Sequence, residues 1–443
     1  MNRSVNRAVN LAIKRVLRAI LLPAALLVSE YQMTDSAIAQ SQPGQRAIDV
    51  FVGDRVADKT SPKEGYNSFR IPALVRLADG DLLAFCEARR DSVNDNGKID
   101  LVLRRSTDNG QTWSGLTIIH GEEGHITIGN PVPIVARDGT VHMLFCRNNR
   151  LGLLHTFSTD RGQTWSKPRE IFDAKGNPGL PDTVKVPMYA VLSKLVGNDV
   201  QTFATGPGHG LQLKSGRLIV PMWYGGMIKV PFTGPRLPAE ALAAAEMQEV
   251  HSTRPELRYN GVIYSDDNGK TWRVGAPGPM GTNETAIAEL ADGTLLLNAR
   301  FITGTQRVIS ESKDGGETLR EHRIDMTLID VACQGSMLTA TLPNNAGEAL
   351  LFCNPAVKGI GFNRRTKLTL RLSRDGGRTW PHAVEIDSGP SAYSDIALLQ
   401  DGKSVGVLYE RGSKEYHERI AFTTVTLEQL LQSSATSSNP VSP

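Results

Sequence analysis

The chain has 443 residues, with 49 lysine and arginine side chains against 46 aspartate and glutamate side chains, so its formal net charge is only +3. A near-neutral chain without a basic run gives no support to nucleic-acid binding, which draws its affinity from clustered Lys and Arg. No spacing typical of metal ligands appears, so we expect neither a metal nor another cofactor. Any anion that the protein binds must therefore meet local, specific groups.

The first 39 residues are typical of a secretory signal. Five basic side chains precede the apolar run "AILLPAALLV", and "AIA" at 37–39 resembles a cleavage site of small residues. The alternative is a membrane anchor, but the uncharged run of roughly ten residues is much shorter than the roughly 20 that span a bilayer. We therefore predict a signal peptide at 1–39 and a secreted or periplasmic protein without stable membrane insertion. Its removal leaves 44 basic and 44 acidic side chains.

One eight-residue pattern, Ser-x-Asp-x-Gly-x-Thr-Trp, recurs along the remaining chain. It begins at Ser106, Ser158, Ser265 and Ser373, and a fifth copy from Ser312 has leucine in place of tryptophan. The Asp and Ser side chains can hydrogen-bond the backbone of a turn, and Gly can take a positive φ there. We expect each tryptophan to cover the edge of its own sheet. Five copies exclude chance.

Tight turns followed by apolar strands form a second periodic signal. They occur in "ADGDLLAF" at 78, "RDGTVHMLF" at 137, "KSGRLIVPM" at 214, "ADGTLLLNA" at 291, "NNAGEALLF" at 344 and "QDGKSVGVL" at 400. Such turns between apolar runs indicate hairpins. One unit thus repeats about every 50 to 80 residues, a period that fits four-stranded propeller blades. We predict an all-β, six-bladed β-propeller with four-stranded antiparallel blades over residues 40–432.

Helical patterns are sparse. "PAEALAAAEMQEV" from Pro238 indicates a short inserted helix, "TLEQLL" from Thr426 indicates a closing turn, and we expect residues 433–443 to be disordered. The four cysteines, Cys86, Cys146, Cys333 and Cys353, all lie in apolar, strand-like stretches and are interpreted as buried thiols. The alternative is a disulfide between Cys333 and Cys353, which flank one predicted hairpin.

"YNSFRIPAL", residues 66–74, places Arg70 inside a stretch that otherwise indicates a buried strand. Because a buried guanidinium needs an anion or several acceptors, Arg70 needs a partner. The combination of "FRIP" with the repeated Asp boxes resembles the bacterial secreted sialidases, or neuraminidases, from about residue 45 to 430. The resemblance implies a six-bladed propeller that acts on terminal sialic acids.

A sialic acid carries a carboxylate on its anomeric carbon, and arginine binds a carboxylate bidentately. By resemblance, the clamp for this group consists of Arg70, Arg300 in "LLLNARF" and Arg365 in "NRRTKLTLRLS". Arg364 competes with Arg365, because consecutive strand residues point to opposite faces and only one can reach the centre. We choose Arg365 from its spacing to the strand "LTLRL".

The substrate carboxylate would repel a carboxylate nucleophile, so a neutral phenol suits the reaction. Tyr393 in "SGPSAYSDIALL" matches the nucleophile segment of the family. A phenol with a pKa of about 10 needs a base, and the resemblance assigns that role to Glu284 in "TNETAIAEL". Glu284 stands 16 residues before Arg300, so we expect one blade to supply both.

The leaving group needs an acid, and the loop between "EARRD" and "KIDLVL" offers three candidates. Asp91 lies too near two arginines, which should keep it ionised, and Asp100 begins the next strand, so the spacing of the family indicates Asp95. By resemblance, Arg89 contacts a ring hydroxyl of the sugar, and Glu410 in "VGVLYERG" orients Arg70. His209 is interpreted as a loop hydrogen-bonder, because no carboxylate stands in an obvious pairing motif with it.

The resemblance implies an exo-α-sialidase that hydrolyses sialylated glycoproteins, glycolipids or oligosaccharides with retention of configuration. We expect a monomer. Two alternatives stay open: a non-catalytic propeller that binds sialylated glycans or protein partners, and a trans-sialidase that uses the same core residues.

Overall fold

The described strands of the computed structural model all lie within the unit Ile38–Pro443. The described residues are 47–56, 63–148, 152–173, 188–197, 199–227, 237–238, 256–302, 304–343, 346–359 and 364–433. The predicted signal peptide therefore lies outside the described residues, as do the tail from residue 434 and all but the first residue of the helix expected at 238–250.

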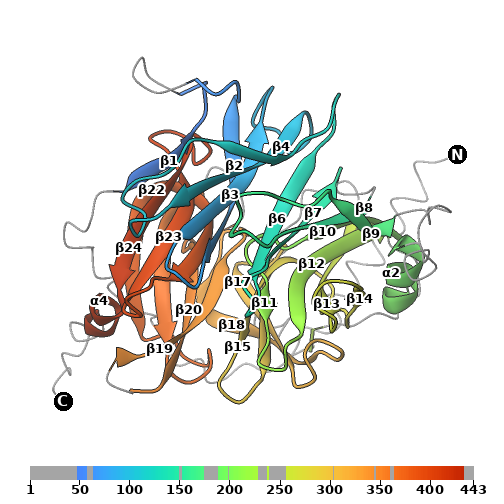
Figure 1. The fold of residues 1–443 in the computed structure, drawn as a ribbon. Coiled ribbons are helices and arrows are strands. Elements are labelled where there is room, and N and C mark those ends of the chain that lie inside the picture. Colours follow the sequence, from blue (N-terminus) through green and yellow to red (C-terminus); the bar gives the residue numbers. More distant parts are fainter. Residues whose placement is uncertain are drawn as a thin grey trace, which may run out of the picture. The chain divides into compact units, whose positions relative to one another are not determined.

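Within the described residues the unit is all-β apart from two short helices, and every paired strand is antiparallel (Figure 1). The first sheet contains β2 (Ser68–Arg76), β3 (Leu82–Arg89), β4 (Ile99–Ser106) and β5 (Thr117–His120). The second contains β6 (Ile128–Val135), β7 (Val141–Arg147), β8 (Gly152–Ser158) and β9 (Arg169–Asp173). The third contains β10 (Asp199–Thr205), β11 (Leu211–Gln212), β12 (Leu218–Met227), β13 (Glu256–Ser265) and β14 (Arg273–Val274).

The fourth sheet is again four-stranded, whereas the last is larger. The fourth contains β15 (Thr282–Glu289), β16 (Leu295–Phe301), β17 (Gln306–Ser312) and β18 (Arg320–Ile329). The last has seven strands in the order β1 (Ile48–Val52), β24 (Arg419–Thr426), β23 (Ser404–Arg411), β22 (His382–Leu398), β21 (Thr366–Ser373), β20 (Glu348–Pro355) and β19 (Ser336–Thr341). The 17 residues of β22 make this possible, because its first part pairs with β21 and its second part with β23.

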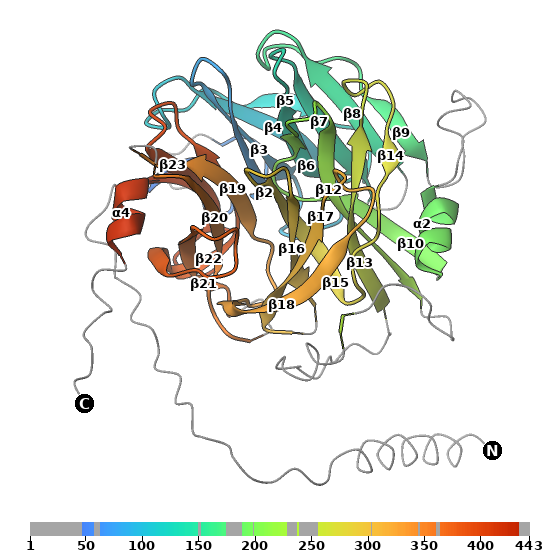
Figure 2. The ribbon, with the colours of Figure 1, turned by 90° about the horizontal axis from the view of Figure 1, so that it is seen from below.

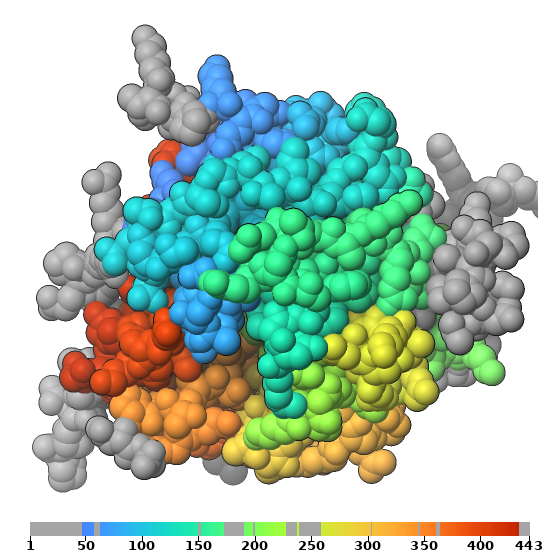
Figure 3. Space-filling model, in the orientation of Figure 1, coloured from blue at the N-terminus to red at the C-terminus, as the bar shows by residue number. Residues whose placement is uncertain are grey.

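The sheets follow one another around a common centre in chain order (Figure 2). Neighbouring sheets meet near the centre, where β2 lies beside both β6 and β22, and β15 lies beside both β12 and β19. In the space-filling view the earliest described segments lie directly against the latest (Figure 3). The expectation of antiparallel four-stranded sheets is thus confirmed.

Six apolar clusters hold the sheets together, and each cluster joins strands from two neighbouring sheets or from the two halves of the seven-stranded one. Between the first two sheets, for example, Leu83 and Phe85 of β3 pack with Met143 and Phe145 of β7. All four side chains are fully buried. Burial of apolar surface stabilises such contacts by roughly 25 cal/mol per Å², so face-to-face packing of sheets is the main source of cohesion.

The expected tight turns lie between consecutive strands, although residues 344–345 of the turn before β20 are outside the described residues. The turn glycines all have positive φ, which a residue without Cβ adopts at little cost: Gly80, Gly139, Gly216, Gly293, Gly347 and Gly402. The sequence signal was strong because the requirement is local to the turn.

The five Asp boxes connect the third and fourth strands of their repeats with one hydrogen-bond pattern. In the first box, the Ser106 hydroxyl accepts from the N–H of Gly110 at 2.8 Å. The Asp108 carboxylate accepts from the N–H of Thr112 at 2.9 Å and from its hydroxyl at 2.6 Å. The other four boxes repeat these bonds.

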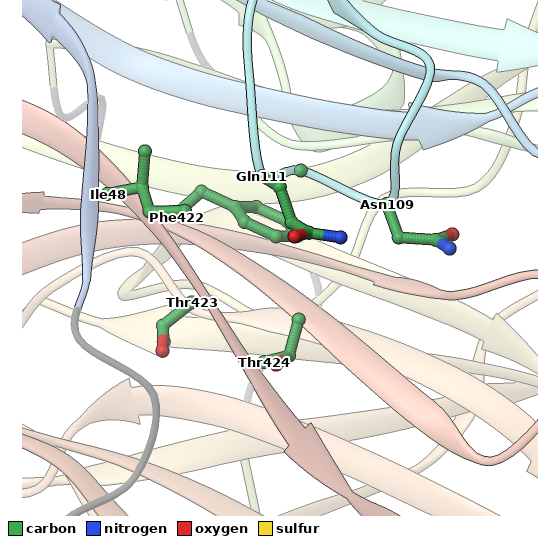
Figure 4. A pocket seen from close by; sticks show the side chains of 7 residues that line it. Ile48, Asn109, Gln111, Phe422, Thr423 and Thr424 are labelled. Atoms are coloured by element: carbon green, nitrogen blue, oxygen red, sulfur yellow. The ribbon is translucent and has the colours of Figure 1, made fainter.

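The expectation that each box tryptophan covers its own sheet was wrong for three of the four, although Trp380 does meet a ring of its own sheet, Phe352 of β20, at 6.0 Å. Trp113 packs on Phe422 of β24, with ring centroids 5.5 Å apart, and Trp165 packs on Phe85 of β3 at 6.0 Å. Trp272 likewise meets His155 of β8 at 5.7 Å. For these three tryptophans the partner ring belongs to the preceding sheet of the ring of sheets, because the box loop projects across the gap between the two sheets. Figure 4 shows the loop residues Asn109 and Gln111 of the first box beside Phe422.

The two described helices are peripheral. The expected closing turn is α4 (Leu427–Gln432), which begins with a capping box formed by Thr426 and Gln429. The sequence did not predict α2 (Met188–Val196), which buries Leu192 and Val196 against the second and third sheets. No helix in the described part of the chain is long and apolar enough to span a bilayer. All four cysteines are buried free thiols, so Cys333 and Cys353 do not pair.

Candidate active site

Three of the predicted site residues lie at register shifts in strands near the centre of the molecule. The register of β2 shifts between Arg70 and Ala73, that of β15 between Thr282 and Thr285, and that of β22 between Ser391 and Ser394. Arg70, Glu284 and Tyr393 lie at or inside these shifts. A bulge bends its strand and redirects a side chain, so it can point residues to the centre that a regular pleat would send into a sheet interface.

Arg70 is bound by a buried carboxylate. Its Nε donates to Glu410 Oε1 at 2.9 Å and its Nη2 donates to Oε2 at 3.0 Å, which is the bidentate geometry of an arginine–carboxylate pair. Ile71, which has a φ of +60°, donates its N–H to the same Glu410 Oε1 at 2.9 Å. Glu410 on β23 therefore holds both the guanidinium and the strained backbone beside it.

Tyr393 and Glu284 form a hydrogen-bonded pair. The phenol of Tyr393 donates to Glu284 Oε1, and Arg300 Nη1 donates to Glu284 Oε2 at 2.6 Å. Glu284 and Arg300 lie on the adjacent strands β15 and β16, so a single sheet supplies both.

The charges around this pair separate the two pKa values. Burial and the Glu284 carboxylate raise the pKa of Tyr393 well above its usual value. Burial also raises the pKa of Glu284, but the charge of Arg300 and the hydrogen bonds to Tyr393 and Arg300 outweigh it, so the net pKa lies below the usual value. The site thus holds a neutral phenol against an ionised carboxylate.

Of the two adjacent arginines, only Arg365 lies at the centre. Its side chain is buried, and its Cζ lies 5.4 Å from the centroid of the Tyr393 ring, nearly the same distance as Arg70 Cζ at 5.3 Å. Arg364 is exposed at the surface. Arg365 also donates to the carbonyl of Ala332 at 3.3 Å. The three arginines chosen from the sequence therefore gather around Tyr393 and its partner Glu284.

Asp95 is the exposed member of the group, with 71% of its side chain accessible. Its Oδ1 lies 2.9 Å from Arg89 Nη1 and 3.5 Å from Arg70 Nη1. Partial burial raises the pKa of Asp95, but the charges of Arg89 and Arg70 outweigh it, so the net pKa lies below the usual value. Neighbouring arginines thus keep Asp95 ionised, as was expected for Asp91.

The other two acid candidates lie elsewhere. Asp100 is buried and accepts from the Tyr66 phenol at 2.8 Å and from Arg90 Nη2 at 3.1 Å. Asp91 is exposed and makes no ion pair with an arginine within the described ranges.

The sequence reading missed the role of Glu87. This buried carboxylate on β3 accepts from Arg89 Nη2 at 2.6 Å and from the N–H of Asn130 at 2.9 Å. Asn130, like Ile71, has a positive φ in a bulged first strand. Glu87 therefore binds an arginine and the bulged first strand of the second sheet, as Glu410 binds an arginine and the bulged first strand of the first sheet. Such a repeat of geometry has no counterpart in the local sequence motifs.

Two further contacts were missed because the partners are distant in sequence, although His209 itself was expected to be a hydrogen-bonder. His209 is bound by a carboxylate, since its Nδ1 lies 2.7 Å from Asp395 Oδ1. Burial lowers the pKa of His209, but Asp395 outweighs burial and raises it. Tyr416, in the loop between β23 and β24, places its ring 5.2 Å from Arg70 Cζ and 5.3 Å from Arg365 Cζ.

The arrangement can bind an anion and deliver a nucleophile to it. Three guanidiniums offer planar donors for a carboxylate, while the Tyr393 phenol donates to Glu284. Within the described ranges, no cluster of His, Cys, Asp and Glu side chains has the geometry of a metal site.

Comparison with known proteins gives a consistent result. The BNR repeat-like domain family matches residues 80–407. The chain is 30% identical to a sialidase of Micromonospora viridifaciens over 379 residues, which cover 79% of this chain and 51% of that protein. It is also 30% identical to an exo-alpha-sialidase of Arthroderma benhamiae, covering 84% of this chain and 87% of that protein.

A solved structure agrees. The Hadza microbial sialidase Hz136 superposes with a TM-score of 0.64 at 27% identity, covering 83% of this chain and 67% of that one. The chain spans about half the length of the Micromonospora relative and most of the length of the Arthroderma one.

Proposed function

The chain belongs to the sialidase family, and from this premise we propose that it is a retaining exo-α-sialidase that releases terminal sialic acids from glycoproteins, glycolipids or oligosaccharides. One observation carries the proposal: the Tyr393 phenol donates to the ionised Glu284 in the middle of Arg70, Arg300 and Arg365. A sugar with a carboxylate on its anomeric carbon would bring that carbon to the phenol by binding the arginines.

The first displacement uses the separated pKa values. The Tyr393 oxygen attacks the anomeric carbon while the phenol proton passes to Glu284. The attack forms a glycosyl–tyrosine bond as the bond to the leaving oxygen breaks. A phenol is neutral before attack, so it approaches the substrate carboxylate without the repulsion that a second carboxylate would meet. Arg300, bound to Glu284 at 2.6 Å, keeps the base ionised until then.

We assign the proton for the leaving oxygen to Asp95. Arg89 and Arg70 lower the pKa of Asp95. A substrate carboxylate bound by the arginines would offset part of their positive charge and would itself place a negative charge close to Asp95. Both changes raise the pKa of Asp95. Binding of the substrate therefore favours the protonated form of Asp95. In the second displacement Asp95 takes a proton from water, which attacks the anomeric carbon. The glycosyl–tyrosine bond breaks, and Glu284 returns its proton to the leaving phenolate.

The sheets support a six-bladed propeller as the scaffold. In this proposal the first four sheets are blades, and the seven-stranded sheet contributes two more that share β22. The six apolar clusters correspond to the six joints of such a ring. We also propose that residues 1–39 direct the protein out of the cytoplasm. We propose further that the protein is a monomer.

The decisive experiment is release of a fluorogenic phenol from an aryl α-sialoside by the purified protein and by Tyr393→Phe. We expect turnover by the parent and at least a roughly 100-fold fall in kcat for the variant, because the nucleophile is lost. A folded parent that binds the sialoside without turnover would instead indicate a glycan-binding propeller. Adding lactose and analysing the products distinguishes a hydrolase from a trans-sialidase, which would make a sialylated lactose.

A further inference from the structure

The loop between β23 and β24 places a second tyrosine against the arginine clamp. The half-buried ring of Tyr416 packs on an apolar cluster that contains Ile71, Cys333 and Tyr393. Its centroid lies 5.2 Å from Arg70 Cζ and 5.3 Å from Arg365 Cζ, both within the range of cation–π attraction.

Tyr393 makes the same two contacts, at 5.3 Å and 5.4 Å. Two guanidiniums and two aromatic rings are therefore held in one group. Like charges this close repel one another, and the negative faces of the rings offset part of that repulsion. Because Tyr393 must move its proton and form a bond to the sugar, Tyr416 is the ring that can hold the two arginines in place throughout the reaction.

The loop that carries Tyr416 is built to hold it. The Glu418 carboxylate accepts from the backbone N–H groups of Ser413, Lys414 and Glu415 at 3.0, 2.8 and 3.0 Å. Arg55 donates to the side chain of Glu415 from the other side. The chain turns so tightly that a Cβ added to Gly412 would lie 2.0 Å from the carbonyl oxygen of Glu415.

We propose that Tyr416 is a positioning residue that keeps Arg70 and Arg365 in the arrangement that binds the substrate carboxylate. The inference rests on the proposed function, since it names a further determinant of the same site. It assigns the role to the ring and not to the phenol group, for which no hydrogen-bond partner is present within the described ranges. Loss of the ring should therefore weaken binding of the carboxylate and leave the chemical step largely intact.

The test compares Tyr416→Leu with Tyr416→Phe by steady-state kinetics on an aryl α-sialoside. We expect Tyr416→Leu to raise KM about tenfold with kcat within about threefold of the parent. Tyr416→Phe keeps the ring and should restore the parental KM. If Tyr416 only supported the fold, Tyr416→Leu would lower kcat, kcat/KM and the melting temperature together. Tyr416→Phe would then not restore KM selectively.

A second measurement isolates the carboxylate. The dissociation constant of a 2,3-dehydro sialic acid should rise about tenfold in Tyr416→Leu, whereas that of its methyl ester should not change. Tyr264→Leu is the matched control, because the Tyr264 ring covers another arginine, Arg217, at 4.0 Å; it should leave KM unchanged. If Tyr416→Leu does not fold, Glu418→Gln loosens the same loop and should raise KM with kcat retained.

The outcomes separate the two proposals. A parent that turns over the sialoside, with Tyr416→Leu unchanged in KM or with Tyr416→Phe as impaired as Tyr416→Leu, overturns the role of Tyr416 alone. A folded parent that neither cleaves the sialoside nor binds the dehydro sugar overturns the proposed function, and the inference with it.

Discussion

Glu410 binds Arg70 through both carboxylate oxygens, at 2.9 Å and 3.0 Å, although 340 residues separate the two in the chain. The same carboxylate accepts from the backbone of Ile71, and its Oε2 lies 3.4 Å from the N–H of Tyr393. One side chain on β23 thus holds the clamp arginine of β2 and the tyrosine-bearing segment of β22.

The first prediction concerns this pair. Glu410→Gln leaves the buried Arg70 charge uncompensated, and breaking a buried ion pair costs about 3–5 kcal/mol of unfolding free energy. We also expect KM for an α-sialoside to rise at least about tenfold, because the guanidinium is no longer oriented. Denaturant unfolding and steady-state kinetics check both parts.

The control for Glu410 is a less buried pair. Glu311 Oε1 accepts from Arg323 at 2.8 Å, and both side chains are partly exposed. Glu311→Gln should cost no more than about 1 kcal/mol and leave KM unchanged. Equal effects of the two substitutions would show that Glu410 has no special part in the site.

The second prediction concerns the base. Glu284→Gln removes the acceptor for the phenol proton, and kcat should fall by about 10² to 10⁴ while the protein keeps its fold. Glu289→Gln is the matched control, because Glu289 ends the same strand and its carboxylate only accepts from the N–H of Lys214. A Glu284→Gln enzyme as active as the control would exclude Glu284 as the base.

The third prediction concerns stability in acid. His155 and His142 are buried between the second and third sheets with their ring nitrogens 3.0 Å apart. Burial lowers the pKa of His155 to about 3, and His142 and Arg169 add to the shift. Since the unfolded chain titrates near 6.5, the folded state binds fewer protons below that pH. Stability is therefore unaffected above about pH 6.5 and falls as the pH drops from there toward 3.

The size of this effect is bounded by one proton, about 1.4 kcal/mol of unfolding free energy per pH unit. His155→Gln should flatten the dependence between pH 6 and 4 in denaturant unfolding. His125→Gln, at an exposed position, should follow the parent. If His155→Gln has the same slope as the parent, the buried pair does not control acid stability.

The fourth prediction tests the role of the boxes as joints between sheets. Trp272 is nearly buried, and its Nε1 donates to the carbonyl of Gly269 at 3.2 Å while its ring meets His155. Trp272→Ala should lower the unfolding free energy by about 3–5 kcal/mol. Leu319, at the same position of the degenerate box, packs on the joint between the third and fourth sheets. Leu319→Ala should cost less, about 2 kcal/mol, because the side chain removed is smaller and only partly buried.

The features that were predictable from sequence are those whose physical cause is local. The turn glycine Gly80 and the Ser106–Asp108–Thr112 bonds of a box act within a few residues, so a short pattern predicts them. The buried guanidinium of Arg70 required a partner on electrostatic grounds alone, and the identity of that partner as Glu410 came from the resemblance.

Features that depend on which strands become neighbours were not predictable. Trp113 was assigned to its own sheet because the sequence does not show that Phe422 lies beside it. The same holds for the pair of His209 and Asp395 and for the ring of Tyr416 over Arg365. The bulges have no recognisable signature either, since nothing local to Glu284 indicates that the register of β15 shifts there.

The pairing of β1 with β24 has a consequence for the order in which the molecule can form. Ile48 pairs with Phe422 and Val52 pairs with Arg419, so β1, the first described strand of the chain, pairs with β24, the last one. Closing a loop of this length is entropically unfavourable, and contacts so distant in sequence form late in folding. Arg70 and Glu410 are subject to the same delay. A chain emerging from the ribosome therefore cannot orient Arg70 through Glu410 until β23 has been made.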